Sequence, residues 1–178
     1  MKRISAALIL VLLLLSACSG GENFDDAASF VGEGEMTLIR MLVNSNAYLV
    51  EEVFVANHLP VDENNITETA DGTFAPVISD KIKTYEDLEK MVYSTYTSEA
   101  AQKLLSEPAK YTEIDGKLCF NMKYDEEINY SVDWSEPKIS AKLSEDGKYM
   151  ITVKVGVKKF ELSAINHNGN IRLEDIYS

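Results

Sequence analysis

Two cysteines and two histidines are the side chains of this 178-residue chain with the most reactive chemistry. His58 and His167 fall in predicted loops or turns, and we interpret both as surface residues. Cys119 could act as a nucleophile only with a base within hydrogen-bond reach, and the sequence gives no sign of one. It lies on the polar phase of a predicted strand, so a partly exposed thiol is expected. We therefore expect no catalytic residue, no cofactor and no enzymatic activity.

Cys18 has a different chemistry, because of what precedes it. Lys2 and Arg3 are followed by an apolar run of about ten residues, which is too short to span a bilayer and typical of a secretory signal. Leu15-Ser16-Ala17-Cys18 then resembles the bacterial lipoprotein signal. It predicts cleavage after residue 17 and lipidation of Cys18, with the protein held on the outer side of a membrane by two or more acyl chains. Residues 18–30 are then expected to be a tether and residues 31–178 a single domain.

Charge is distributed unevenly along the chain. The net charge is −12, and residues 18–72 carry eleven acidic residues against one basic residue, Arg40. Such a chain repels phosphates, so nucleic acid is not an expected partner. The stretch Asp62-Glu63-Asn64-Asn65 lacks the glycine and closing glutamate of a calcium loop, and no metal site is expected. The acidic residues either meet a cationic partner or keep the protein soluble beside an anionic envelope; the candidate binding residues among them are Asp62, Glu63, Glu68 and Asp71.

Lysines gather later in the chain, on the polar phase of the predicted strands: Lys117, Lys123, Lys138, Lys142, Lys148 and Lys154. They either protect sheet edges or form a basic face for an anionic wall polymer or another partner, with Lys142 and Lys154 as candidate binding residues. Trp134 lies at a strand end. It is either an anchor at the edge of the core or a binding aromatic, since tryptophan is frequent at interface hot spots.

Helical periodicity dominates the first half of the domain. Residues 33–46 carry a partial apolar stripe, residues 50–56 fit helix or strand, and residues 58–73 are expected to form a long polar loop. Thr84 is a good helix N-cap, with Glu86 and Asp87 in the first turn. A second short helix is expected to begin at Thr97 or Ser98.

From residue 109 the period changes to two. Alternating runs are separated by the hairpin signals Asp115-Gly116, Asp146-Gly147 and Asn168-Gly169. They predict a meander of five or six antiparallel strands, apolar on one face. The fold class expected is α+β, with the N-terminal helices packed on one face of a curved antiparallel sheet.

Three segments carry a resemblance to a known family: Lys83-Thr84-Tyr85-Glu86-Asp87-Leu88, Tyr96-Thr97-Ser98-Glu99-Ala100-Ala101 and Ile114-Asp115-Gly116-Lys117-Leu118. They are similar to the DL-endopeptidase inhibitors of Gram-positive bacteria, across about residues 76–178. The resemblance implies an NTF2-like or cystatin-like fold and a protein that restrains a cell-wall peptidase by blocking its active site. It carries over no catalytic residue.

Two function classes are therefore open. One is a binding or inhibitory module of the cell envelope. The other is an NTF2-like ligand-binding protein or enzyme with a pocket between helices and sheet. The second needs titratable groups on the inward phase of the strands, where only tyrosines offer a polar atom, so the first is preferred.

Overall fold

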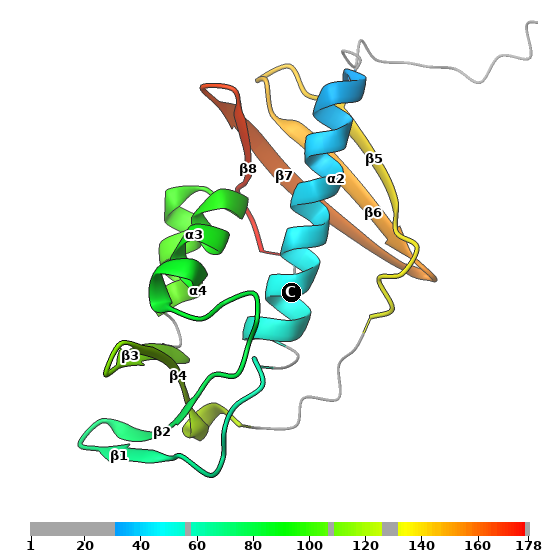
Figure 1. Ribbon diagram of the computed structural model, residues 1–178. Coiled ribbons are helices and arrows are strands. Elements are labelled where there is room, and N and C mark those ends of the chain that lie inside the picture. Colours follow the sequence, from blue (N-terminus) through cyan, green and yellow to red (C-terminus); the bar gives the residue numbers. More distant parts are fainter. Residues whose placement is uncertain (1–30, 56–57, 107–108, 126–131, 177–178) are drawn as a thin grey trace, which may run out of the picture.

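The computed structural model describes residues 31–55, 58–106, 109–125 and 132–176. The predicted signal and tether, Cys18 included, lie outside these residues. In the described part the chain is α+β, with helices α2, α3 and α4 and two four-stranded antiparallel sheets. Helix α2 lies across one face of the sheet β5–β8, and α3 and α4 lie beside it, between the two sheets (Figure 1).

Helix α2 (Glu33–Tyr48) begins where the Glu35 carboxylate accepts the Gly32 N–H at 3.0 Å, which satisfies a donor that has no partner within the helix. It buries the expected stripe, with Ile39 and Val43 fully inaccessible. The helix then widens into a π-helical segment, η1 (Leu49–Phe54), whose Leu49, Val50, Val53 and Phe54 are all buried. The open choice between helix and strand for residues 50–56 is thus settled as helical through Phe54.

Helix α3 (Tyr85–Thr95) has the predicted cap. Thr84 Oγ1 accepts the Asp87 N–H at 3.1 Å, and Asp87 Oδ2 accepts the Thr84 N–H at 3.1 Å. Asp87 Oδ2 also accepts the Lys83 N–H at 3.1 Å, and the bonds from Lys83 and Thr84 hold the pKa of the Asp87 carboxyl below its usual range. Helix α4 (Ser98–Ser106) follows as predicted. The connection between the two helices is bound to the edge of the second sheet, because the Thr97 N–H donates to the Leu173 carbonyl at 2.8 Å.

The first sheet has the order β1-β2-β4-β3, from strands β1 (Thr67–Thr69), β2 (Gly72–Pro76), β3 (Tyr111–Ile114) and β4 (Lys117–Asn121). The expectation of a long polar loop over residues 58–73 is wrong for its second half, since β1 and the start of β2 form a hairpin there. Asp115 (φ 51°) and Gly116 (φ 72°) make the predicted two-residue turn between β3 and β4. A short 3₁₀ segment, η2 (Met122–Tyr124), follows β4.

The second sheet has the order β5-β6-β7-β8, from β5 (Lys138–Leu143), β6 (Tyr149–Val155), β7 (Lys158–His167) and β8 (Asn170–Leu173). The predicted single meander is therefore wrong: β3 and β4 belong to the first sheet, because β2 pairs with β4. One of the alternating runs that the sequence shows after residue 109, Ile128 to Val132, lies mostly outside the described residues, and Val132 is not in a strand.

One apolar core joins the helices and both sheets. Its members come from α2, η1, α3, α4, β3, β4, β6, β7 and β8, and Leu88, Val92, Phe120, Ile151 and Leu173 are among those with almost no exposed surface. The inward phase of β6 is the predicted one, with Tyr149, Ile151, Val153 and Val155 buried. Packing side chains thus fill the space between α2 and the second sheet. None of the described helices combines the length and apolarity needed to cross a membrane.

Candidate functional site

The face of sheet β5–β8 that points away from α2 carries a row of lysines. In the strand register Lys138 is opposite Lys154, and Lys154 is opposite Lys159. All three residues are exposed. Neighbouring strands lie about 4.8 Å apart, and like charges directly opposite one another destabilise a sheet. We call these three residues the lysine row, and the face that bears them the outer face.

Among the described carboxylates, only that of Glu161 forms an ion pair with the lysine row. Lys159 Nζ lies 2.6 Å from Glu161 Oε1, an exposed pair of the kind that contributes little to stability. Lys138 and Lys154 make no ion pair with any residue that the structure describes. The row is thus a concentrated positive patch on a protein of net charge −12.

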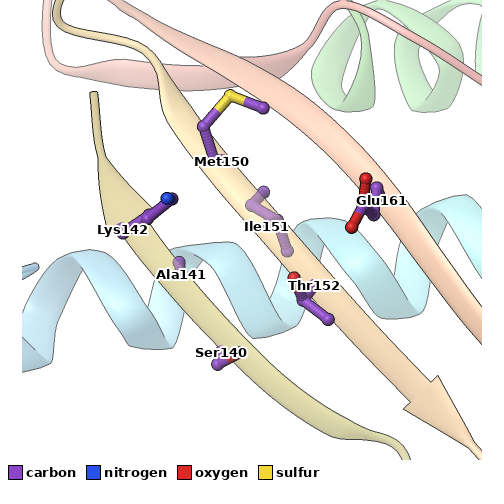
Figure 2. A pocket seen from close by; sticks show the side chains of 7 residues that line it. All are labelled: Ser140, Ala141, Lys142, Met150, Ile151, Thr152 and Glu161. Atoms are coloured by element: carbon purple, nitrogen blue, oxygen red, sulfur yellow. The ribbon is translucent and has the colours of Figure 1, made fainter. Parts of the chain in front are cut away.

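A groove of about 390 Å³ continues along the strands from the lysine row. Figure 2 shows the residues that line it, with α2 behind the sheet: Ser140, Ala141, Lys142, Met150, Ile151, Thr152 and Glu161. Ala141 and Ile151 belong to the inward phase of their strands, and the other five residues belong to the outer face. Met150 is 40% exposed and directly opposite Lys142. The groove therefore combines a cation, a carboxylate, hydroxyls and an exposed thioether.

A second hollow, of about 610 Å³, is lined in part by two members of the lysine row. Its lining includes Lys138, Lys154 and Lys158, together with Asp133 and Glu136 from the segment before β5. The two hollows take neighbouring positions on β5 and β6, because the pair Lys138 and Lys154 lines one and the pair Ser140 and Thr152 lines the other.

The predicted lysine face is only partly present. Lys142 and Lys154 lie on the outer face as expected, together with Lys138. Lys117 and Lys123 do not, because they belong to β4 and η2 in the other part of the fold. Lys148, at the strand end before β6, binds the Glu174 carboxylate at 2.9 Å, and this bond raises its pKa.

The acidic candidate residues lie far from the lysine row in the fold, around the β1–β2 hairpin (Figure 1). Asp62 Oδ1 accepts the Asn64 N–H at 3.1 Å and Asp62 Oδ2 accepts the Asn65 amide at 2.6 Å, which lowers the Asp62 pKa. Glu68 lies in β1 and Asp71 in the hairpin turn, and both are exposed, as is Glu63. Among the described residues, no group of three or more His, Cys, Asp or Glu is placed to hold a metal ion.

Trp134 lies at the edge of the core. Its ring stacks on Phe160 with the centroids 5.4 Å apart, and its Nε1–H donates to Glu51 Oε1 at 3.2 Å. Glu51 is only 6% exposed, so the indole provides one of the partners that a buried carboxylate needs. This position matches the reading of Trp134 as a core-edge anchor.

His58 and Cys119 differ from their expected settings. The His58 ring stacks on Phe120 at 4.1 Å, and its two nitrogens face the Leu59 carbonyl at 2.7 Å and Asp125 Oδ1 at 3.1 Å. The His58 ring therefore contacts Phe120 of β4 and Asp125 after η2, and is not a free side chain of a surface turn. Cys119 is buried, not partly exposed, because β4 is the inner strand between β2 and β3 and is covered on both faces. Burial raises the pKa of the Cys119 thiol, which disfavours the reactive thiolate.

Lys159 is the member of the lysine row that the sequence reading missed. A signal was available: Gly156, at φ 57°, and Val157 form a two-residue hairpin loop, since Val155 is opposite Lys158. With that turn recognised, Lys154 and Lys159 are necessarily cross-strand neighbours.

Comparison with known proteins assigns neither a family nor a function to the chain. No protein-family model matches the chain, and no curated protein matches it.

Proposed function

We propose that this chain is a lipid-anchored binding protein of the bacterial cell envelope that holds an anionic wall polymer on its outer face. The lysine row carries this proposal. Cross-strand lysines repel one another, so a protein rich in acidic residues loses stability by keeping three of them in register. A polyanion would relieve that repulsion and gain affinity through release of its counterions.

The anchor follows from the sequence around Cys18, and it places the domain against the membrane surface. Lipid on Cys18 would hold residues 31–178 near the wall, where the local concentration of a polymer is high. Weak contacts made by a few lysines are sufficient for such a tethered protein.

The NTF2-like or cystatin-like assignment remains part of this proposal. A helix lying on an antiparallel sheet supports it. Catalysis in a pocket between α2 and the second sheet is less favoured, because Ile39, Val43, Ile151 and Val153 fill that space. The packing therefore favours binding at the outer surface over catalysis in an internal pocket.

Restraint of a cell-wall peptidase is a second candidate, favoured by the β1–β2 hairpin. This hairpin projects at the end of the molecule away from the second sheet and carries Glu68 and Asp71 at exposed positions (Figure 1). A projecting acidic hairpin fits a cleft lined by cations. This role makes no use of the lysine row, so an experiment on the row separates the two candidates.

Neutralising the row in a Lys138→Gln, Lys154→Gln, Lys159→Gln variant is expected to weaken binding of polyphosphate at least about tenfold at low salt. The slope of log affinity against log salt concentration should become less negative by roughly three, about one for each lysine that no longer contacts a phosphate. The same variant should be as stable as the parent in urea or up to about 1 kcal/mol more stable, because cross-strand repulsion is removed. Affinity is measured by titration of the full chain in neutral detergent micelles.

The control replaces Lys83, Lys103 and Lys117 with glutamine, which changes the net charge equally at exposed positions away from the row. It should bind polyphosphate nearly as well as the parent. Equal weakening in both variants would mean that total charge, not the lysine row, attracts the polymer.

Cys18→Ala is expected to leave the protein without lipid and its precursor uncleaved by the lipoprotein peptidase. The thiol is the atom that accepts the diacylglycerol, and alanine offers no substitute. Labelling with radioactive palmitate in a bacterial host measures the result, with Cys119→Ala as the matched control. Label retained in the Cys18→Ala protein would contradict the anchor assignment.

A further inference from the structure

Two hydrogen bonds hold the side chain of Arg172, on β8, and part of its guanidinium makes no hydrogen bond with the described residues. Its Nε–H donates to the Tyr93 carbonyl at 3.0 Å, and its Nη1 donates to the Ile171 carbonyl at 2.8 Å. No carboxylate of the described residues forms an ion pair with it. A guanidinium has five N–H donors, so these two carbonyls leave three of them available.

Arg172 lines a cavity of about 340 Å³, which we call the Arg172 cavity. Three segments build it: the connection from α3 to α4, the end of β7 and the start of β8. Its lining is Tyr93, Tyr96, Thr97, Ser98, Ile165, His167, Asn170 and Arg172.

The walls of this cavity are fixed in place by backbone bonds. Ile165 is directly opposite Arg172 in the register of β7 and β8, so both lie on the same face of the sheet. The α3–α4 connection is bound to β8 through a bridge between Tyr96 and Leu173 and through the Thr97 N–H bond to Leu173. A site whose backbone is already ordered loses less entropy when a ligand binds.

The lining groups select one ligand chemistry. A guanidinium with free N–H groups binds a carboxylate through two parallel hydrogen bonds. The Ser98 hydroxyl and the Asn170 amide offer further donors, whereas the Tyr93 ring and the Ile165 side chain offer apolar surface. We propose that the Arg172 cavity binds an organic carboxylate, with its charged end on Arg172 and its apolar body against Tyr93 and Ile165. This site is separate from the lysine row and does not depend on the function proposed above.

A purely structural role for Arg172 makes a different prediction. Its bonds to Tyr93 and Ile171 alone would tie α3 to β8, and the cavity would then show no preference for a charged ligand. The full chain has three arginines, Arg3, Arg40 and Arg172. Labelling arginine with ¹⁵N therefore gives few Nε–Hε signals, and exposed Arg40 on α2 serves as an internal control.

The experiment titrates the labelled full chain, in neutral detergent micelles, with benzoate, with its uncharged analogue benzamide and with inorganic phosphate. Benzoate should shift the Arg172 Nε–Hε signal and the Ile165 methyl signal saturably, with the Arg40 signal unmoved. Benzamide should give neither shift, and phosphate should bind at least about tenfold more weakly than benzoate because it gains nothing from the apolar wall. The proposal is overturned if benzoate gives no saturable shift. It is also overturned if benzamide gives shifts equal to those of benzoate, or if phosphate binds as tightly as benzoate.

Two variants complete the test, read at the Ile165 methyl. Arg172→Lys keeps the charge but loses the planar fork, and should weaken benzoate at least about tenfold. Tyr93→Ala keeps the Tyr93 carbonyl, and thus its bond to Arg172. It should still weaken benzoate binding, because it removes the ring that forms the apolar wall. Arg40→Lys should bind benzoate as the parent does. If Arg172→Lys fails to fold by circular dichroism, Tyr93→Ala decides, and unchanged affinity in that variant overturns the proposal.

Discussion

Phe120→Ala is expected to lower the free energy of unfolding by about 3–5 kcal/mol, the usual range for removing a buried phenylalanine. Phe120 has no exposed surface, and its ring contacts that of His58 at 4.1 Å and that of Tyr111 at 5.4 Å. These neighbours belong to different segments, so they cannot easily close together over the cavity that alanine would leave. Urea unfolding followed by circular dichroism measures the change.

Lys123→Ala is the control for this prediction, because Lys123 is exposed and close in sequence, in η2. It should change the free energy of unfolding by less than about 0.5 kcal/mol, as surface substitutions do. Equal losses in the two variants would contradict the burial of Phe120 in the core.

The phase of a strand can be predicted from the sequence where the sheet has one buried face. In β6 the alternation of Tyr149, Ile151, Val153 and Val155 with polar residues matches the burial of the strand. The helix caps and the two-residue turns are also local, and Thr84, Asp115-Gly116 and Asn168-Gly169 behave as their residue types predict.

The same reasoning fails for β4, because this strand is covered on both faces. Leu118, Cys119, Phe120 and Asn121 are all buried, so alternation carries no information about which side faces solvent. The sequence pattern also failed to predict the division into two sheets, because this division depends on contacts between residues far apart in the chain. The division depends on the pairing of Phe74 with Asn121, residues far apart in sequence whose local patterns do not reveal each other.

The candidate site was only partly predictable for a related reason. Lys142 and Lys154 follow from alternation within single strands. The lysine row itself is a property of register, because it needs Lys138 and Lys159 to lie directly opposite Lys154. The Arg172 cavity needs the α3–α4 connection to reach the edge of β8, and no local pattern in the sequence indicates that contact.

Tyr111→Phe is expected to lower the free energy of unfolding by about 2–4 kcal/mol, although it removes a single oxygen atom. The hydroxyl of Tyr111 donates to the Val53 carbonyl at 2.7 Å and accepts the Leu59 N–H at 3.0 Å. Both bonds are buried, and phenylalanine would leave the carbonyl and the amide unpaired, at a cost of about 1–3 kcal/mol for each group. Burial raises the Tyr111 pKa further above neutrality, so the hydroxyl remains a donor throughout the ordinary pH range.

This hydroxyl joins β3 of the first sheet to the end of η1, so its loss should also have a local signature. The Leu59 amide should exchange with solvent faster in Tyr111→Phe, relative to amides in β6, than in the parent protein. Tyr85→Phe is the matched control: Tyr85 is half-buried in α3, and its hydroxyl makes no hydrogen bond with the described residues. It should change the free energy of unfolding by less than about 0.5 kcal/mol. If Tyr111→Phe proves equally harmless, water must pair the two backbone groups, and the attachment of the first sheet to η1 must then rest on apolar packing around Phe54 and Phe120 alone.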